Sequence, residues 1–341
     1  MGILHRRNLV IVGAGASFEF GLPIGSELKR QISSLVSFRQ DNLGHIAGGN
    51  TVVRRAIQNM AAKKLLDIRD AYSACVQISK NMSTAHSIDS FIASHRENTA
   101  LAVVAKMAIV CSILLAERRS TLYVSPDNTY NELNFGKIED TWLAKYARML
   151  ITGRSLEEFL AALSQVTFLT FNYDRCIEHY FEWLVKVHYG AEKIALSDAL
   201  LVHHVYGSVG ELSAEGHGAT PFGTEPDEHT IIRNFDKIST FHEEIQEGDV
   251  REVIDSALNP GGLLIFLGFA FLPMNMRFFE ISEVELDRIV ATSKGQSPDD
   301  IKFLKNEFRV LFPNGPEILF DSERCADLFD YYYRYLTRST E

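Results

Sequence analysis

The feature that most constrains the fold of this chain is a short apolar run near its start that ends at two glycines. Residues 8–12 (NLVIV) have the composition of a buried parallel strand, and residues 13–17 (GAGAS) follow at once. A strand that stops at a glycine turn and enters a helix directs several backbone N–H groups at one place, which suits a phosphate or pyrophosphate. Close packing alone also produces this pattern, so both interpretations stay open.

Strand and helix patterns alternate in the first and last thirds of the chain, around a central helical block. Strands are predicted at residues 8–12, 166–171, 200–206 and 263–267, with a short β-like piece at 317–320 in an otherwise helical tail. This order predicts an α/β fold, a doubly wound, Rossmann-like parallel sheet with an inserted helical module. We place the sheet domain at residues 1–37 and 161–341, and the helical module at residues 38–160.

Composition and charge exclude several classes of protein. A net charge of −10 argues against a general binder of nucleic acids or anionic membranes. The apolar runs at 102–116 and 263–274 are shorter than the ~20 residues that a membrane span needs. Residues 1–7 lead directly into the first strand without a signal-peptide pattern. We therefore expect a cytoplasmic protein that contacts neither nucleic acid nor membrane directly.

The four cysteines are scattered along the chain and form no C-x-x-C pair. Without such a pair, and without a secretory signal, neither a zinc site nor a disulfide framework is expected. We expect no bound metal and four buried side chains that act as small apolar groups: Cys75, Cys111, Cys176 and Cys325.

Four polar or glycine-rich stretches come directly after predicted strands. They are residues 13–17, 172–174, 204–208 and 268–275. The carboxyl ends of parallel strands lie at one edge of a sheet, where ligands bind in doubly wound folds. The four stretches are therefore predicted to form one shared site.

These motifs resemble the sirtuin superfamily, and within it the prokaryotic, defence-associated sirtuin-like NAD hydrolases. The family's Gly-Ala-Gly-x-Ser loop is matched by residues 13–17, and its Thr-Gln-Asn-Ile-Asp by residues 170–174 (TFNYD). Residues 266–271 (FLGFAF), with Asn275, look like the branch's last NAD-contacting segment. Residues 88–91 (IDSF) are similar to a signature of its helical module. The resemblance covers residues 8–280.

The chain departs from the deacylases of this superfamily in three ways. Their zinc-binding cysteines are missing, and Pro23 is not followed by Asp-Phe-Arg. Their catalytic His-Gly is replaced by Tyr206-Gly207, with histidines at 203 and 204. Side chains at i and i+2 of a strand share a face, so we expect His204 to lie on the side of Tyr206 and His203 to point away.

The resemblance implies an NAD hydrolase that releases nicotinamide and ADP-ribose, with NAD as substrate. Asn172 would hold a water or the ribose hydroxyls, or merely form an Asx turn. Asp174 would bind the nicotinamide amide or balance positive charge, or cap the next helix. His204 would act as a general base, or be an ordinary strand histidine.

The remaining predicted site residues contact the dinucleotide. They are Gly13, Ala14, Gly15, Ser17, Thr170, Tyr206, Gly207, Ser208, Gly268, Phe269 and Asn275. Gly13, Gly15 and Ser17 would bind the pyrophosphate, while Gly268 and Phe269 would line the adenosine half or form an ordinary strand-end turn. Phe18 stands where a dehydrogenase fingerprint needs a third glycine, which disfavours hydride transfer.

The family resemblance also implies a role as an antiviral effector in prokaryotes. Such an enzyme must be held inactive, and nearly the whole chain is used by the predicted catalytic fold. We therefore expect a homo-oligomer, or a separate sensor, ATPase or Argonaute-like partner. Two alternatives remain: a protein deacylase or ADP-ribosyl transferase, and a non-catalytic scaffold that binds NAD or ADP-ribose.

Overall fold

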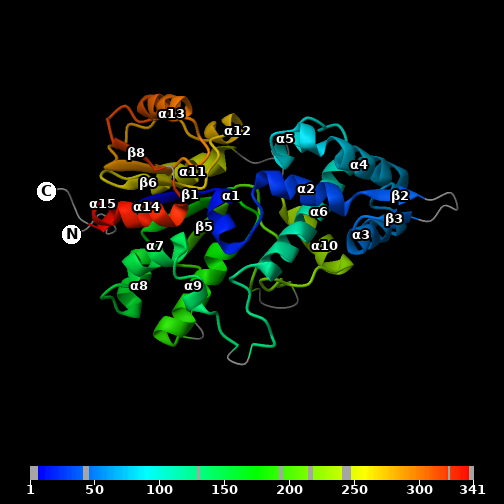
Figure 1. Ribbon diagram of the computed structural model, residues 1–341, viewed down its shortest axis with the longest axis horizontal. Helices are drawn as coiled ribbons and strands as arrows, with labels where there is room; N and C mark the ends of the chain where they lie inside the picture. The colour runs from blue at the N-terminus through cyan, green and yellow to red at the C-terminus, as the bar shows by residue number, and fades with distance from the viewer. Residues whose placement is uncertain are drawn as a thin grey trace.

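A computed structural model describes residues 7–40, 46–128, 131–191, 194, 196–213, 218–239, 247–321 and 323–337. Within these residues the fold is built on a six-stranded, all-parallel sheet (Figure 1). Its strands are β1 (Asn8–Val12), β4 (Val166–Thr170), β5 (Leu201–His204), β6 (Leu263–Leu267), β7 (Arg288–Thr292) and β8 (Glu317–Asp321). They lie in the order β5-β4-β1-β6-β7-β8. The predicted doubly wound, Rossmann-like α/β fold is confirmed.

The strand order reverses beside β1, at the point where ligands bind in folds of this kind. β1 pairs on one side with β4 and on the other with β6. Val12 is level with Thr170 of β4 and with Leu267 of β6, so the three central strands end together. The segments that follow these strands therefore emerge side by side.

The two faces of the sheet carry separate cores because side chains alternate along each strand. Leu9 and Ile11 of β1 belong to the first core, and Val10 and Val12 belong to the second. The first core also takes residues from α11 (Glu247–Ala257) and α13 (Pro298–Leu311). The second core takes residues from α7 (Trp142–Ile151), α8 (Leu156–Leu163), α9 (Cys176–Tyr189) and α14 (Cys325–Tyr331).

A block of helices extends the first core away from the sheet, on the right in Figure 1. It contains α2 (Gly25–Leu35), α3 (Thr51–Ala62), α4 (Ile68–Asn81), α5 (Ile88–Ala93), α6 (Thr99–Arg119) and α10 (Glu228–Asn234). α6 is long and apolar enough to cross a membrane by composition, but most of it is buried among the neighbouring helices. Its burial is that of a core helix.

The helices within residues 38–160 fall into two packing groups. α3 to α6 pack with α2 and α10, whereas α7 packs against α14 and α8 against α7, on the second face of the sheet. The predicted domain boundaries at 37/38 and 160/161 stay a prediction. α8 begins with a capping box, in which Ser155 and Glu158 bond to each other's backbone N–H groups.

The prediction for the tail is wrong at one strand. The tail was expected to be helical apart from residues 317–320, but β7 is a fully buried strand. Its five residues are too few for their periodicity to distinguish a strand from a helix. Outside the main sheet, β2 (Phe38–Gln40) pairs with β3 (Ile46–Gly48) in an antiparallel hairpin.

The remaining elements of the described residues are short. They are α1 (Ala14–Ser17), η2 (Phe18–Phe20), η3 (Met82–Thr84), η4 (Phe135–Lys137), η5 (Phe235–Lys237), α12 (Pro273–Met276) and α15 (Tyr333–Thr337). All four cysteines are free and buried, as predicted.

The turns after β1 and β6 touch through their backbones. The N–H of Gly13 donates to the Leu267 carbonyl, and that of Gly15 to the Gly268 carbonyl at 3.0 Å. A Cβ on Gly13 would lie 2.5 Å from the Gly268 carbonyl oxygen, and a Cβ on Gly268 would lie 2.1 Å from the Ala16 nitrogen. Gly268 also has a positive φ of 56°. Only glycine fits this contact.

Replacing Gly268 with alanine is expected to lower the free energy of unfolding by at least about 3 kcal/mol, because the new Cβ collides with backbone that cannot move aside. The matched control is Gly153→Ala. Gly153 has a similar positive φ of 71°, but a Cβ added there would meet no described atom within 4 Å. That variant should lose only about 1 kcal/mol. Urea denaturation measures both, and equal losses would contradict the packing argument.

Candidate active site

The carboxyl ends of β1 and β4 are joined by a buried network of polar side chains. Asn172 follows β4, and its Nδ2 donates to the Gly13 carbonyl at 3.0 Å and to Ser17 Oγ at 2.9 Å. Ser17 Oγ in turn donates to Asp174 Oδ1 at 3.1 Å. Asn172, Ser17 and Asp174 are all buried. The structure therefore brings together two of the predicted segments that are far apart in the sequence.

Local hydrogen bonds position the two residues of this network that follow β4, Asn172 and Asp174. Thr170 Oγ1 accepts from the N–H of Asn172 at 3.1 Å, which shapes the turn where β4 ends. Asp174 Oδ1 accepts from the N–H of Cys176, the first residue of α9, at 3.2 Å. Asp174 thus satisfies one of the helix's free N–H groups, the alternative role foreseen for it. Burial raises the pKa of Asp174, against these hydrogen bonds.

The hydrogens of the network are already used, which limits what it can offer a ligand. Both Nδ2 hydrogens of Asn172 and the hydroxyl hydrogen of Ser17 are donated within the protein. What Asn172 can still present is its acceptor oxygen Oδ1. The network is therefore suited to accept a hydrogen bond from a water or a hydroxyl group.

His204 joins the same edge of the sheet but is held on both ring nitrogens. Its Nδ1 bonds to the Asn172 carbonyl at 2.9 Å and its Nε2 to Glu178 Oε1 of α9 at 2.7 Å. Burial disfavours the imidazolium, but Glu178 and the carbonyl outweigh it and raise the pKa of His204. Burial alone would raise the pKa of Glu178, but the attraction and hydrogen bond of His204 outweigh burial, so the pKa of that carboxyl is lowered. A doubly donating imidazolium satisfies both acceptors.

Tyr206 does not lie on the side of His204, so that expectation is wrong. β5 ends at His204, and the alternation of side chains ends with it. Tyr206 lies in the first core, where its ring is 5.9 Å from that of Phe171, and its hydroxyl donates to Asn275 Oδ1 at 2.6 Å. His204 instead reaches α9, whose buried residues lie in the second core. His203 is exposed.

The other residues predicted to contact the dinucleotide lie in different environments. Phe269 is buried and its ring is 4.9 Å from that of Phe171, so it serves the core. Gly207 has a positive φ of 71° and bridges to Ile238, while Ala14 and Ser208 are half-buried. Close packing accounts for Gly13, Gly15 and Gly268. Their contact with a dinucleotide stays a prediction.

Sequence reasoning did not identify the buried ion pair between Arg175 and Glu117. Arg175 follows the 172–174 turn, and its Nε donates to Oε1 of Glu117, in α6, at 3.0 Å. The side chains are 1% and 0% exposed. Arg175 also donates to the carbonyls of Gly210 and Thr220. The pair therefore ties the turn to the helical block, and no local pattern could reveal a partner 58 residues away.

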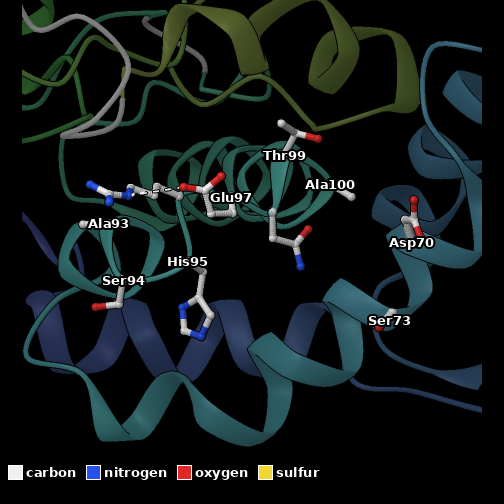
Figure 2. A pocket seen from close by; sticks show the side chains of 10 residues that line it. Asp70, Ser73, Ala93, Ser94, His95, Glu97, Thr99 and Ala100 are labelled. Atoms are coloured by element: carbon white, nitrogen blue, oxygen red, sulfur yellow. Dashed lines mark ion pairs between the residues drawn. The ribbon is translucent and has the colours of Figure 1, made fainter.

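Two described cavities lie away from this edge. One of about 830 Å³ is in the helical block, between α4 and the turn from α5 to α6, where Asp70, Ser73, His95 and Glu97 line it (Figure 2). The other, about 360 Å³, lies between α7 and α9. Among the residues that the structure describes, no group of three or more histidine, cysteine or acidic side chains is placed to hold a metal ion.

The fold and the strand-end network define a Rossmann-like α/β protein with a polar cluster at the reversal point of its sheet. Neither family models nor curated proteins give a match to this chain.

Breaking the buried ion pair by Glu117→Gln is expected to cost about 3–5 kcal/mol of unfolding free energy, because Arg175 is left charged and buried. Glu225→Gln is the matched control, since Glu225 pairs with Arg118 at 2.7 Å but is 68% exposed. It should cost no more than about 1 kcal/mol. Denaturation of both variants measures the difference, and comparable losses would contradict the assignment.

The pair of His204 and Glu178 predicts a pH window of stability. Because folding raises the pKa of His204, this residue stabilises the fold fully below pH 6.5, the ordinary histidine pKa. That stabilisation is lost as the pH rises through the pKa of His204 in the folded protein. Because folding lowers the pKa of Glu178, this residue stabilises the fold fully above pH 4.5, the ordinary pKa of a glutamate. That stabilisation is lost as the pH falls through the pKa of Glu178 in the folded protein. The stability gap between wild type and Glu178→Gln should therefore be widest from pH 4.5 to 6.5. A gap that widens towards pH 9 would refute the pair.

Proposed function

We propose that the chain is an NAD glycohydrolase that cleaves the nicotinamide–ribose bond of NAD to give nicotinamide and ADP-ribose. The observation that supports this is the hydrogen-bonded cluster of Asn172, Ser17 and Asp174 against the Gly13 carbonyl, at the carboxyl ends of β1 and β4. Dinucleotides bind at this place in doubly wound folds. The family motifs that imply NAD as substrate supply the same residues.

The reaction needs little acid assistance, because the nicotinamide leaves a cationic ring as a neutral molecule. What the protein must supply is a placed water and stabilisation of an oxocarbenium-like transition state. In this proposal Asn172 Oδ1 orients the water or a ribose hydroxyl. Asp174 lies one side chain away, through Ser17, and balances the developing positive charge when it is ionised.

His204 takes a different role in this proposal from the general base foreseen in the sequence. Because Nδ1 and Nε2 bond to the Asn172 carbonyl and to Glu178, the imidazolium has no free nitrogen to accept a proton. We assign it to positioning the 172–174 turn.

Activation by a partner remains part of the proposal. A homo-oligomer, or a separate sensor, ATPase or Argonaute-like protein, would release the activity in an antiviral response. If the purified chain alone consumes NAD at its full rate, this part of the proposal fails while the enzyme activity stands.

The test is to incubate the chain, alone and with candidate activators, with NAD and to identify the products by chromatography. Asn172→Ala is expected to lower kcat at least about 100-fold, since it removes a preorganised polar group from the reacting centre. Glu225→Gln, an exposed site outside the network, is the control and should retain activity. Thermal unfolding verifies that both variants fold.

Three results would overturn the proposal. Turnover of an acyl-lysine peptide without free ADP-ribose would favour a deacylase, and transfer of ADP-ribose to protein would favour a transferase. Binding of NAD with no turnover in any assembly would favour a scaffold.

A further inference from the structure

The helical block contributes one carboxylate to the carboxyl edge of the sheet. Asp89 lies in the first turn of α5, and its Oδ1 accepts a hydrogen bond of 2.5 Å from the Tyr173 hydroxyl. Tyr173 stands between Asn172 and Asp174, so Asp89 reaches the segment that carries the candidate site. α5 is fixed there by its cap residue Ser87, whose Oγ is 3.8 Å from the sulfur of Met274.

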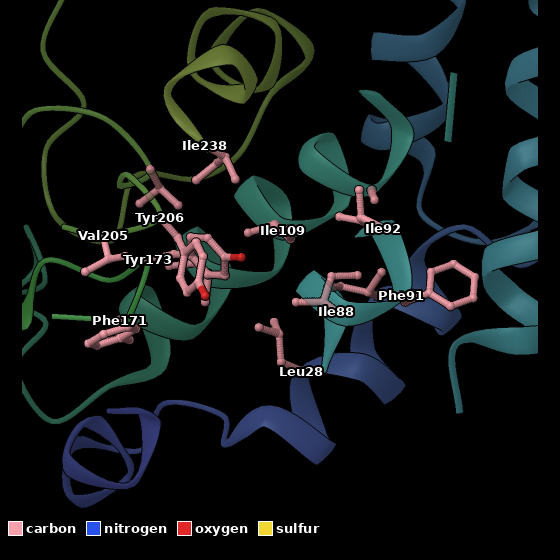
Figure 3. Packing of buried hydrophobic residues seen from close by; sticks show 14 of the residues in the cluster. Leu28, Ile88, Phe91, Ile92, Ile109, Phe171, Tyr173, Val205, Tyr206 and Ile238 are labelled. Carbon is pink, nitrogen blue, oxygen red and sulfur yellow. The ribbon is translucent and has the colours of Figure 1, made fainter. Parts of the chain in front are cut away.

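The Tyr173 ring, whose hydroxyl Asp89 holds, has a second aromatic neighbour. The rings of Tyr173 and Tyr206 have their centroids 6.4 Å apart, and both lie between the strand ends and the helical block (Figure 3). The Tyr206 hydroxyl is held by Asn275 of α12. The hydroxyl of each ring is therefore held by a different residue, that of Tyr173 by Asp89 and that of Tyr206 by Asn275.

The charge of Asp89 is not balanced by a cation within the part of the chain that the structure describes, where it makes no ion pair. Burial raises its pKa to about 6, so the carboxyl is ionised at neutral pH. Asp89 is half-buried, so an ionised carboxylate at this place attracts a cation by charge.

We propose that Asp89 attracts the positively charged nicotinamide ring of oxidised NAD and discriminates it from the neutral ring of the reduced form. This inference rests on the proposed function. It makes the helical block part of the substrate site, and it assigns to Asp89 a specificity role that the cluster around Asn172 does not supply.

The proposal predicts an effect on binding and not on the chemical step. Positive charge leaves the nicotinamide ring as the glycosidic bond breaks, so Asp89 stabilises the bound substrate rather than the transition state. Asp89→Asn should therefore raise KM for NAD without lowering kcat. A residue that only docks α5 would show no dependence on the charge of the ligand.

The experiment measures Kd for oxidised and reduced NAD by calorimetry, in an Asn172→Ala background that blocks turnover. Asp89→Asn should weaken binding of the oxidised form roughly tenfold and leave the reduced form unchanged. Asp89→Glu keeps the charge and should restore most of the discrimination. Asp70→Asn, which removes an exposed carboxylate of α4 on the helical block's own cavity, is the matched control (Figure 2).

The outcomes separate this inference from the proposed function. If wild type releases nicotinamide from NAD but Asp89→Asn weakens both forms equally, or neither, the inference fails alone. If wild type neither binds nor cleaves NAD, both fail. Equal loss in the asparagine and glutamate variants, with a lowered melting temperature, would show a purely structural role for Asp89.

Discussion

The candidate site depends on the contact between two backbone turns, after β1 and after β6. Three glycines allow it, because a Cβ on Gly13, Gly15 or Gly268 would meet the opposing backbone at 3.0 Å or less. The contact fixes the Gly13 carbonyl, which receives the Asn172 amide. In the sequence these glycines suggest a phosphate-binding loop. In the structure they are required for close packing, whether or not they also bind a ligand.

Two ion pairs, one buried and one half-buried, hold the other half of the site. Arg175, joined to Glu117, ties the end of the 172–174 turn to α6, and His204, joined to Glu178, supports the Asn172 carbonyl from α9. The pair of Arg175 and Glu117 carries charge in a fully buried setting, where losing one partner costs far more than at the surface. The two pairs orient the polar cluster and leave its acceptor oxygens for chemistry.

The helical block is more than a support for the sheet. Its core is continuous with the first face, and α5 reaches the strand ends through Asp89. The strand ends alone offer a cluster rich in acceptors. The block adds a carboxylate that holds the Tyr173 hydroxyl, as expected for a site formed where two parts of a fold meet.

The sequence by itself determined the alternation of strands and helices, the burial of β1 and β6, and the placing of polar stretches at strand ends, because these depend on periodicity and on local turn chemistry. Tertiary structure alone decided that β7 is a strand, that Tyr206 turns away from His204, and that Arg175 finds Glu117. Periodicity does not show where a strand stops pairing, and it carries no information about partners distant along the chain. Charge balance in the interior is settled only when distant segments pack together.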